Sequence, residues 1–179
     1  MGDRKAFFYG TLMVPKVLYR VCYGDENADK NPLYDFHTKS LTFQPAILHD
    51  FSRRRVRYAD YPGIIPQKGH TIRGTFVTGL TDGDIYRLNT FEGEQYKLKK
   101  VRVELLVEGR VEKPDEENVM ADAEVYVWSD YEEHLEDREW DFEEFRREKL
   151  HRWVDSSTEY EDLDKLEETP GPDSKHAGV

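Results

Sequence analysis

The chain has 179 residues, a length typical of one globular domain whose core buries most of its apolar surface. Its formal net charge of −11 argues against binding to nucleic acid or to an anionic membrane surface, since both depend on an excess of Lys and Arg. The single cysteine excludes an internal disulfide, and no apolar run approaches the ~18 residues of a membrane-spanning helix. We therefore expect a cytoplasmic protein, with neither nucleic acid nor a membrane as its partner.

The opening stretch, residues 5–12 with the sequence KAFFYGTL, predicts a short apolar strand that stops at Gly10. A glycine at this point lets the backbone turn sharply and leaves neighbouring N–H groups uncovered. Helical periodicity begins at Pro15, so the chain runs from a strand through a small-residue loop into a helix. Such a loop can bind an anion on its backbone amides, although an ordinary strand–turn–helix corner has the same pattern.

The helix predicted after this loop begins at Pro15 and ends at Gly24, positions that these two residue types favour. Its apolar residues recur at helical spacing and form one stripe. They are Val14, Val17, Leu18, Val21 and Cys22. The place of Cys22 on that stripe favours a small core residue over a nucleophile. The polar residues 25–40 that follow are expected to form a loop.

Four further strands and one helix are predicted in the middle of the chain, from apolar alternation and from turn residues. The helix begins at Thr81, which has capping-box spacing with Asp84, and it ends at Gly93. The strands are expected at residues 41–50, 71–80, 95–108 and 121–128.

Two segments between these elements bear on a ligand site. Residues 61–66, with the sequence YPGIIP, predict an irregular loop whose apolar side chains are placed to line a pocket. The basic triplet at residues 53–55 has the charge to bind a phosphate or a carboxylate. In an acidic protein, however, we expect the triplet to pair with surface carboxylates.

The C-terminal part of the chain changes in composition after a predicted helix that Asp141 caps. From residue 155 onward acidic residues outnumber basic ones, which predicts a solvated and flexible tail. We therefore expect one domain at residues 1–154 and an acidic tail at residues 155–179. The charged residues 109–120 are predicted to form a turn or excursion between two strands.

Among the acidic residues, Glu92 has the local sequence that best suits a catalytic carboxylate. It lies in the last turn of the helix that ends at Gly93, where the helix dipole disfavours the ionised form. The adjacent Phe91 adds desolvation, which also raises the pKa and suits general-base work. An exposed, frayed helix end is the alternative. One cysteine and six scattered histidines give no metal-ligand spacing, so no metal site is expected.

Five short motifs follow one another in an order that resembles the γ-glutamylcyclotransferase superfamily. They are YGTL at 9–12, YPGI at 61–64, LNTFEG at 88–93 followed by Tyr96, YVW at 126–128 and EWDFEEF at 139–145. The last two are similar to the branch of plant avirulence-induced proteins and their fungal relatives, the AIG2-like proteins. The resemblance extends from residue 5 to the region of residue 154. It implies a single α+β domain, a mixed β-barrel with surrounding helices.

The resemblance implies an acyltransferase- or lyase-type enzyme that cleaves a small-molecule γ-glutamyl amide to 5-oxoproline and a free amine. The α-amine attacks the γ-carbonyl of its own glutamyl group, and Glu92 is the implied general acid and base. Backbone N–H groups of a substrate-binding loop would bind the α-carboxylate and the developing oxyanion. That loop is implied to comprise Tyr9, Gly10, Thr11, Leu12, Met13 and Val14. Further residues expected to line the pocket are Tyr61, Pro62, Tyr96 and Tyr126.

The resemblance implies no metal and no cofactor, and the sequence does not indicate an oligomeric state. Two other functions remain open. A binding or regulatory protein can keep this fold without the reaction, and a hydrolase using the same loop would release free glutamate. The chain also departs from many relatives, with Asn89 where they carry aspartate and Gln95 where they carry glutamate. The identity of the released amine is left open.

Overall fold

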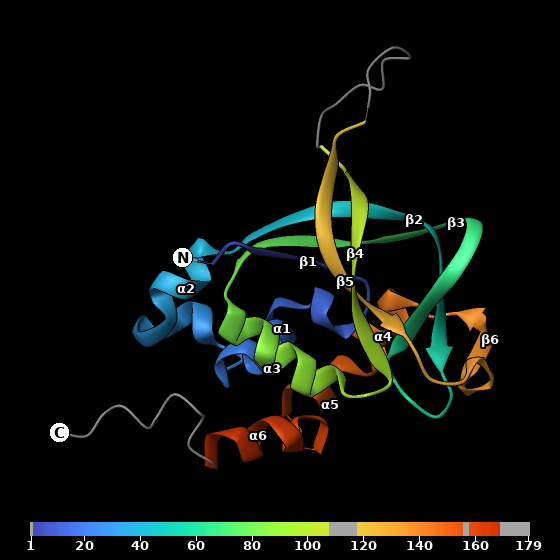
Figure 1. Cartoon of the computed structure of the whole chain (residues 1–179). Coiled ribbons are helices and arrows are strands. Elements are labelled where there is room, and N and C mark those ends of the chain that lie inside the picture. Colours follow the sequence, from blue (N-terminus) through green and yellow to red (C-terminus); the bar gives the residue numbers. More distant parts are fainter. Residues whose placement is uncertain (1, 108–117, 156–157, 169–179) are drawn as a thin grey trace.

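The chain folds around a closed β-barrel, described here from a computed structural model for residues 2–107, 118–155 and 158–168 (Figure 1). In those residues the strand order is β3-β1-β5-β4-β2-β6, and β3 also pairs with β2. That additional pairing closes the first five strands into a barrel, while β6 extends β2 outside it. The strands are β1 (Arg4–Phe8), β2 (Thr42–Val56), β3 (Pro62–Leu80), β4 (Tyr96–Leu105), β5 (Met120–Trp128) and β6 (Leu135–Glu139). The mixed barrel that the resemblance implied is confirmed.

The helices α1, α3 and α6 gather on one side of the barrel, below the strands in Figure 1. No helix in the described part of the chain has the length and apolar character needed to span a bilayer. The helices are α1 (Pro15–Tyr23), α2 (Asp35–Ser40), α3 (Asp82–Glu92), α4 (Phe142–Glu148), α5 (Leu150–Asp155) and α6 (Glu161–Glu168). The short 3₁₀ turns are η1 (Thr11–Met13), η2 (Ala28–Lys30), η3 (Pro32–Tyr34), η4 (Glu132–His134) and η5 (Thr158–Tyr160).

Strand β1 and the residue after it contribute to two separate cores, because successive side chains of a strand point to opposite faces. Phe7 and Tyr9 belong to a cluster with residues of β2–β5 that fills the barrel. Ala6 and Phe8 belong to a second cluster, between the barrel and the helices. The apolar stripe of α1 lies in this second cluster and includes Cys22, which is buried as expected. Both cores therefore meet where β1 ends.

The loop expected at residues 25–40 is wrong, because η2, η3 and α2 form there. The side chain of Asn31 accepts a hydrogen bond from the Leu33 N–H at 3.0 Å, which caps η3. Tyr34 stacks on Tyr23 of α1 with ring centroids 5.4 Å apart. A local cap and one aromatic contact thus order a segment whose composition is polar.

The irregular loop expected at residues 61–66 is also wrong. Residues 62–66 begin β3 and pair with residues 51–55 of β2. Strand β6 was not predicted, since its sequence LEDRE has no apolar alternation. Pairing with β2, rather than its own side chains, forms this strand.

The basic triplet pairs with carboxylates, as expected. Its ion pairs tie β2 to β6 and to the turn before it. They are Arg53–Glu139 at 3.3 Å, Arg54–Glu132 at 3.0 Å and Arg55–Glu136 at 3.6 Å.

The C-terminal segment differs in part from the expected solvated tail. Within residues 158–168, η5 and α6 form, and Tyr160 and Leu163 are only 1% and 0% exposed. Tyr160 stacks on Phe91 of α3 with ring centroids 5.9 Å apart. Apolar side chains spaced three residues apart in the acidic run therefore dock this segment on the domain.

Two other expectations concern residues that the structure does not describe. The charged excursion predicted at residues 109–120 falls mostly within residues 108–117, outside the described part. Residues 169–179 are also outside it, so a flexible tail there stays a prediction.

Helix α3 begins and ends at the predicted residues. Thr81 and Asp84 form a capping box, in which each side chain accepts a hydrogen bond from the other's backbone N–H, at 3.0 and 2.9 Å. Gly93 ends the helix with φ 74° and ψ −166°, a backbone conformation that is essentially restricted to glycine. The chain therefore turns away directly after Glu92 and leaves that side chain at the helix end.

Replacing Gly93 with alanine should lower the free energy of unfolding by about 1–3 kcal/mol, because a Cβ is strained at this φ and ψ. Urea denaturation measures the loss. Gly83→Ala, in the first turn of the same helix, is the matched control and should be neutral or stabilising by up to about 1 kcal/mol. Unchanged stability of the Gly93 variant would contradict the strained conformation.

Candidate active site

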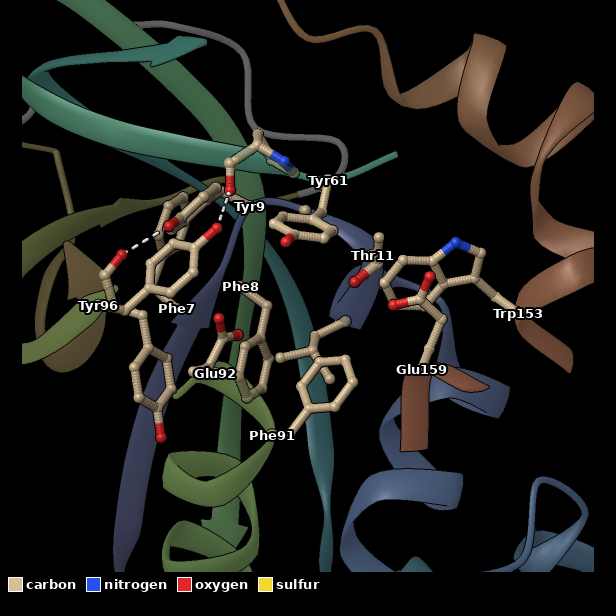
Figure 2. Close-up of a pocket in the computed structure, with 14 residues that line it drawn as sticks. Phe7, Phe8, Tyr9, Thr11, Tyr61, Phe91, Glu92, Tyr96, Trp153 and Glu159 are labelled. Carbon is tan, nitrogen blue, oxygen red and sulfur yellow. Dashed lines mark hydrogen bonds between the residues drawn. The ribbon is translucent and has the colours of Figure 1, made fainter. Parts of the chain in front are cut away.

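A pocket of about 110 Å³ opens where β1 ends, between the barrel and the helices (Figure 2). By the same measure one water molecule needs roughly 10–15 Å³, so the pocket can hold several non-hydrogen atoms of a ligand. Among the described residues that line it, two are acidic and none is Lys, Arg or His. An anionic group bound here would therefore depend on backbone or hydroxyl donors.

The pocket brings together most of the residues that the sequence singled out. These are Tyr9, Gly10, Thr11, Leu12, Tyr61, Pro62, Glu92, Tyr96 and Tyr126. Met13 and Val14 do not line it, because Val14 is buried in the helix-side core and Met13 packs against that core. These two residues anchor the loop to the helix-side core.

Sequence reasoning did not assign five lining residues to the pocket. They are Phe7, Phe8, Phe91, Trp153 and Glu159. In the sequence the four aromatic residues are indistinguishable from core residues. The pocket is lined by side chains that also pack in the core, so apolar character alone does not identify the lining. Glu159 lies in an acidic run that composition assigns to solvent, and nothing in the sequence separates it from its neighbours.

The loop after β1 lies close against the start of β3, and Gly10 permits that approach. A Cβ at Gly10 would be 2.9 Å from Cδ of Pro62, so a larger residue would displace the loop. Nη1 of Arg53 donates a hydrogen bond to the carbonyl oxygen of Tyr9 at 2.8 Å. The first residue of the basic triplet thus holds the loop as well as pairing with a surface carboxylate.

The backbone N–H groups of this loop divide into two sets. Those of Met13 and Val14 donate to the carbonyl oxygens of Gly10 and Thr11, at 3.0 and 3.1 Å. Those of Gly10, Thr11 and Leu12 have no acceptor among the residues that the structure describes. The donors without an acceptor therefore belong to the three loop residues that line the pocket.

Three tyrosine hydroxyls fix the pocket wall, and Figure 2 shows two of these tyrosines, Tyr9 and Tyr96. Tyr9 donates to the carbonyl oxygen of Tyr126 at 2.6 Å, and Tyr96 donates to that of Pro62 at 2.8 Å. Tyr126 donates to Oδ1 of Asn89 at 2.8 Å. Burial raises the pKa of each of these tyrosines, and the charge of Glu92 raises it further, so all three remain neutral donors.

Glu92 projects from the end of α3 into this aromatic enclosure (Figure 2). Desolvation by burial raises the pKa of its carboxyl to about 8. No side chain in the described part of the chain bonds to the carboxyl, which therefore keeps its full hydrogen-bonding capacity for a ligand. No group of three His, Cys, Asp or Glu side chains there is placed to hold a metal ion.

Fold and pocket together define a barrel that sets one desolvated carboxyl in a pocket with a loop of uncovered amides. Two solution structures of Arabidopsis thaliana proteins share this fold. One is 19% identical with a TM-score of 0.54, covering 93% of this chain and 94% of that one. The other is 23% identical with a TM-score of 0.51, covering 98% and 90%. The profile of the family described as gamma-glutamyl cyclotransferase, AIG2-like, matches residues 6–145, and the chain belongs to this family.

Two proteins from the same plant are similar to this chain in sequence. Protein AIG2 B of Arabidopsis thaliana is 31% identical over 116 residues, which are 65% of this chain and 63% of that protein. AIG2-like protein C is 28% identical over 162 residues, which are 90% of this chain and 80% of that protein. The chain thus spans less than two thirds of the length of the first relative.

The free energy of unfolding should depend on pH through Glu92. The carboxyl pKa rises from 4.5 to about 8 on folding, so between these values the unfolded state is ionised while the folded state holds its proton. Ionisation thus favours unfolding, and stability falls as pH rises through this window. Glu92→Gln removes the cost of ionising this carboxyl. The free energy of unfolding of the variant should therefore rise relative to the wild type by up to about 1.4 kcal/mol per pH unit in this window.

Urea denaturation at pH 5, 6, 7 and 8 would measure this difference, because the window runs from 4.5 to about 8. Glu94→Gln is the matched control, since Glu94 is exposed and does not line the pocket. A stability difference between Glu92→Gln and wild type that is constant with pH would contradict the desolvated carboxyl.

Proposed function

We propose that the protein is a γ-glutamylcyclotransferase that converts a γ-glutamyl amide to 5-oxoproline and a free amine, with Glu92 carrying the proton. One observation supports this most strongly: the desolvated Glu92 carboxyl and the uncovered amides of Gly10, Thr11 and Leu12 line the same pocket. Membership of the gamma-glutamyl cyclotransferase, AIG2-like family supports the same reaction class.

The reaction needs one nucleophile, which the substrate itself provides. The α-amine attacks the γ-carbonyl carbon, so a bond from nitrogen to this carbon forms and the bond from the carbon to the amide nitrogen breaks. The α-ammonium loses two protons overall, and the departing nitrogen gains two, so the amine leaves as an ammonium ion. Both reacting groups belong to one molecule, so holding the glutamyl chain curled supplies much of the rate. No electron transfer occurs, and the proposal includes no metal or cofactor.

Glu92 suits both proton transfers. A pKa of about 8 makes its ionised form a strong enough base to accept a proton from the substrate ammonium near neutral pH. The protonated carboxyl can then donate to the leaving nitrogen. Its lack of a partner in the described part of the chain leaves it able to turn from one nitrogen to the other.

The loop amides suit the two anionic oxygens of the reaction. The substrate's α-carboxylate has no Lys or Arg to bind among the described lining residues, so the N–H groups of Gly10, Thr11 and Leu12 are its proposed partners. One of these donors can also stabilise the oxyanion that develops on the γ-carbonyl. The aromatic side chains of the lining leave little room for water beside a bound substrate, which favours ring closure over hydrolysis.

Glu92→Gln should lower the rate of 5-oxoproline release by about 10²–10⁴-fold, the usual contribution of a positioned acid–base group. Mass spectrometry of products from a panel of γ-glutamyl amides measures it. The matched control is Glu94→Gln, on an exposed neighbour outside the pocket. Full activity of Glu92→Gln would exclude the assignment. Free glutamate as product would indicate a hydrolase, and ligand binding without turnover a binding protein.

The pH dependence of kcat/KM should follow the ionisation of the Glu92 carboxyl. The base must be ionised, so kcat/KM is expected to rise with pH and to bend at an apparent pKa of about 8. Asn89→Asp adds a negative charge one helical turn before Glu92 and keeps the acceptor for Tyr126, so it should move the bend to higher pH. A profile that is flat above pH 6 in both proteins would show that Glu92 is not the base.

A further inference from the structure

The C-terminal segment contributes a second carboxylate to the pocket. Trp153 of α5 and Glu159 of η5 line it, although the family profile ends at residue 145. In Figure 2, Glu159 lies beside Trp153 and Thr11 and on the other side of Phe91 from Glu92. The two carboxylates therefore lie at different places in the pocket lining.

The position of Glu159 is fixed through its neighbour Tyr160. The Tyr160 ring stacks on Phe91 with centroids 5.9 Å apart and an angle of 20° between the planes. Its hydroxyl donates to the carbonyl oxygen of Trp153 at 2.8 Å, and the Arg20 guanidinium lies 4.6 Å from its ring centroid. Because Phe91 directly precedes the proposed proton carrier, this contact sets Glu159 at a defined place relative to the chemistry.

The charge of Glu159 is not neutralised by a bonded partner in the described part of the chain. The nearby guanidinium of Arg152 is bound by both carboxylate oxygens of Asp60, at 3.1 and 3.2 Å. Trp153 Nε1 donates to the same carboxylate at 3.2 Å. Burial raises the pKa of Glu159, the charge of Asp60 raises it further, and Arg152 lowers it.

Tyr61 lies close enough to both carboxylates for each charge to affect its pKa. Burial raises its pKa, and the charges of Glu159 and Glu92 raise it further, so both acids act on one ring. In the proposed reaction the α-amine lies at Glu92 and the α-carboxylate at the loop amides. We place the leaving amine past Tyr61, toward Glu159, because Glu159 is the remaining charged group of the lining.

We propose that Glu159 is a specificity-determining residue, which favours γ-glutamyl amides whose leaving amine carries a second, cationic group and disfavours those whose leaving amine carries a carboxylate. This inference rests on the proposed function. The acid and the loop amides belong to the part of the chain that the family profile matches, whereas selection of the amine belongs to the segment after it.

Three γ-glutamyl amides of equal length test the inference: those of putrescine, butylamine and γ-aminobutanoate, which end in an ammonium, a methyl and a carboxylate group. We expect wild type to follow that order of kcat/KM. Glu159→Gln should lower the ratio of kcat/KM for the putrescine amide to that for the γ-aminobutanoate amide by about fourfold or more, since a partly exposed attraction or repulsion between two charges changes each value by roughly two- to fivefold. Glu159→Lys should reverse the order.

The butylamine amide reports any general effect of a substitution, and Glu161→Gln, on an exposed residue of the same segment outside the pocket, is the matched control. An equal change for all three amides in Glu159→Gln would place Glu159 at the α-ammonium and overturn the inference. Unchanged ratios would overturn it as well, while leaving the proposed function intact. Wild type that releases 5-oxoproline from none of the three amides would overturn the inference, whereas the proposed function is overturned only if the whole panel of γ-glutamyl amides yields none.

Discussion

The constraint on which the pocket depends is the half-buried carboxyl group of Glu92, which is desolvated and has no bonded partner in the described part of the chain. Such a group is costly once it ionises, and a fold retains it only where the surrounding structure is stable enough to tolerate the cost. The surrounding tyrosines cannot relieve it, because Tyr9 and Tyr96 donate their hydroxyl protons to backbone carbonyls. Glu92 therefore keeps the raised proton affinity that a ligand with an ionisable nitrogen can use.

Local chemistry in the sequence was enough to predict the elements that position this group. Thr81, Asp84 and Gly93 define the ends of α3 through a capping box and a positive φ, and both features depend on residues close in sequence. Pro15 and Gly24 delimit α1 for similar reasons. The barrel itself was expected from the resemblance to a family, because no local pattern indicates which strands close on one another.

The features that sequence reasoning missed are those that depend on distant partners. Strand β6 has charged side chains and forms because β2 offers it a paired edge. Residues 62–66 read as a loop by composition, and pairing with β2 makes them a strand. Glu159 resembles every other acid of its run, and only the docking of Tyr160 on Phe91 brings it to the pocket.

The stacked rings of Phe91 and Tyr160 join two segments of the chain that line one pocket. Phe91 belongs to the residues that the family profile matches, and Tyr160 lies beyond the end of that match, within residues 158–168. A substitution at either ring would therefore move Glu159 relative to Glu92 and leave the strands of the barrel in place.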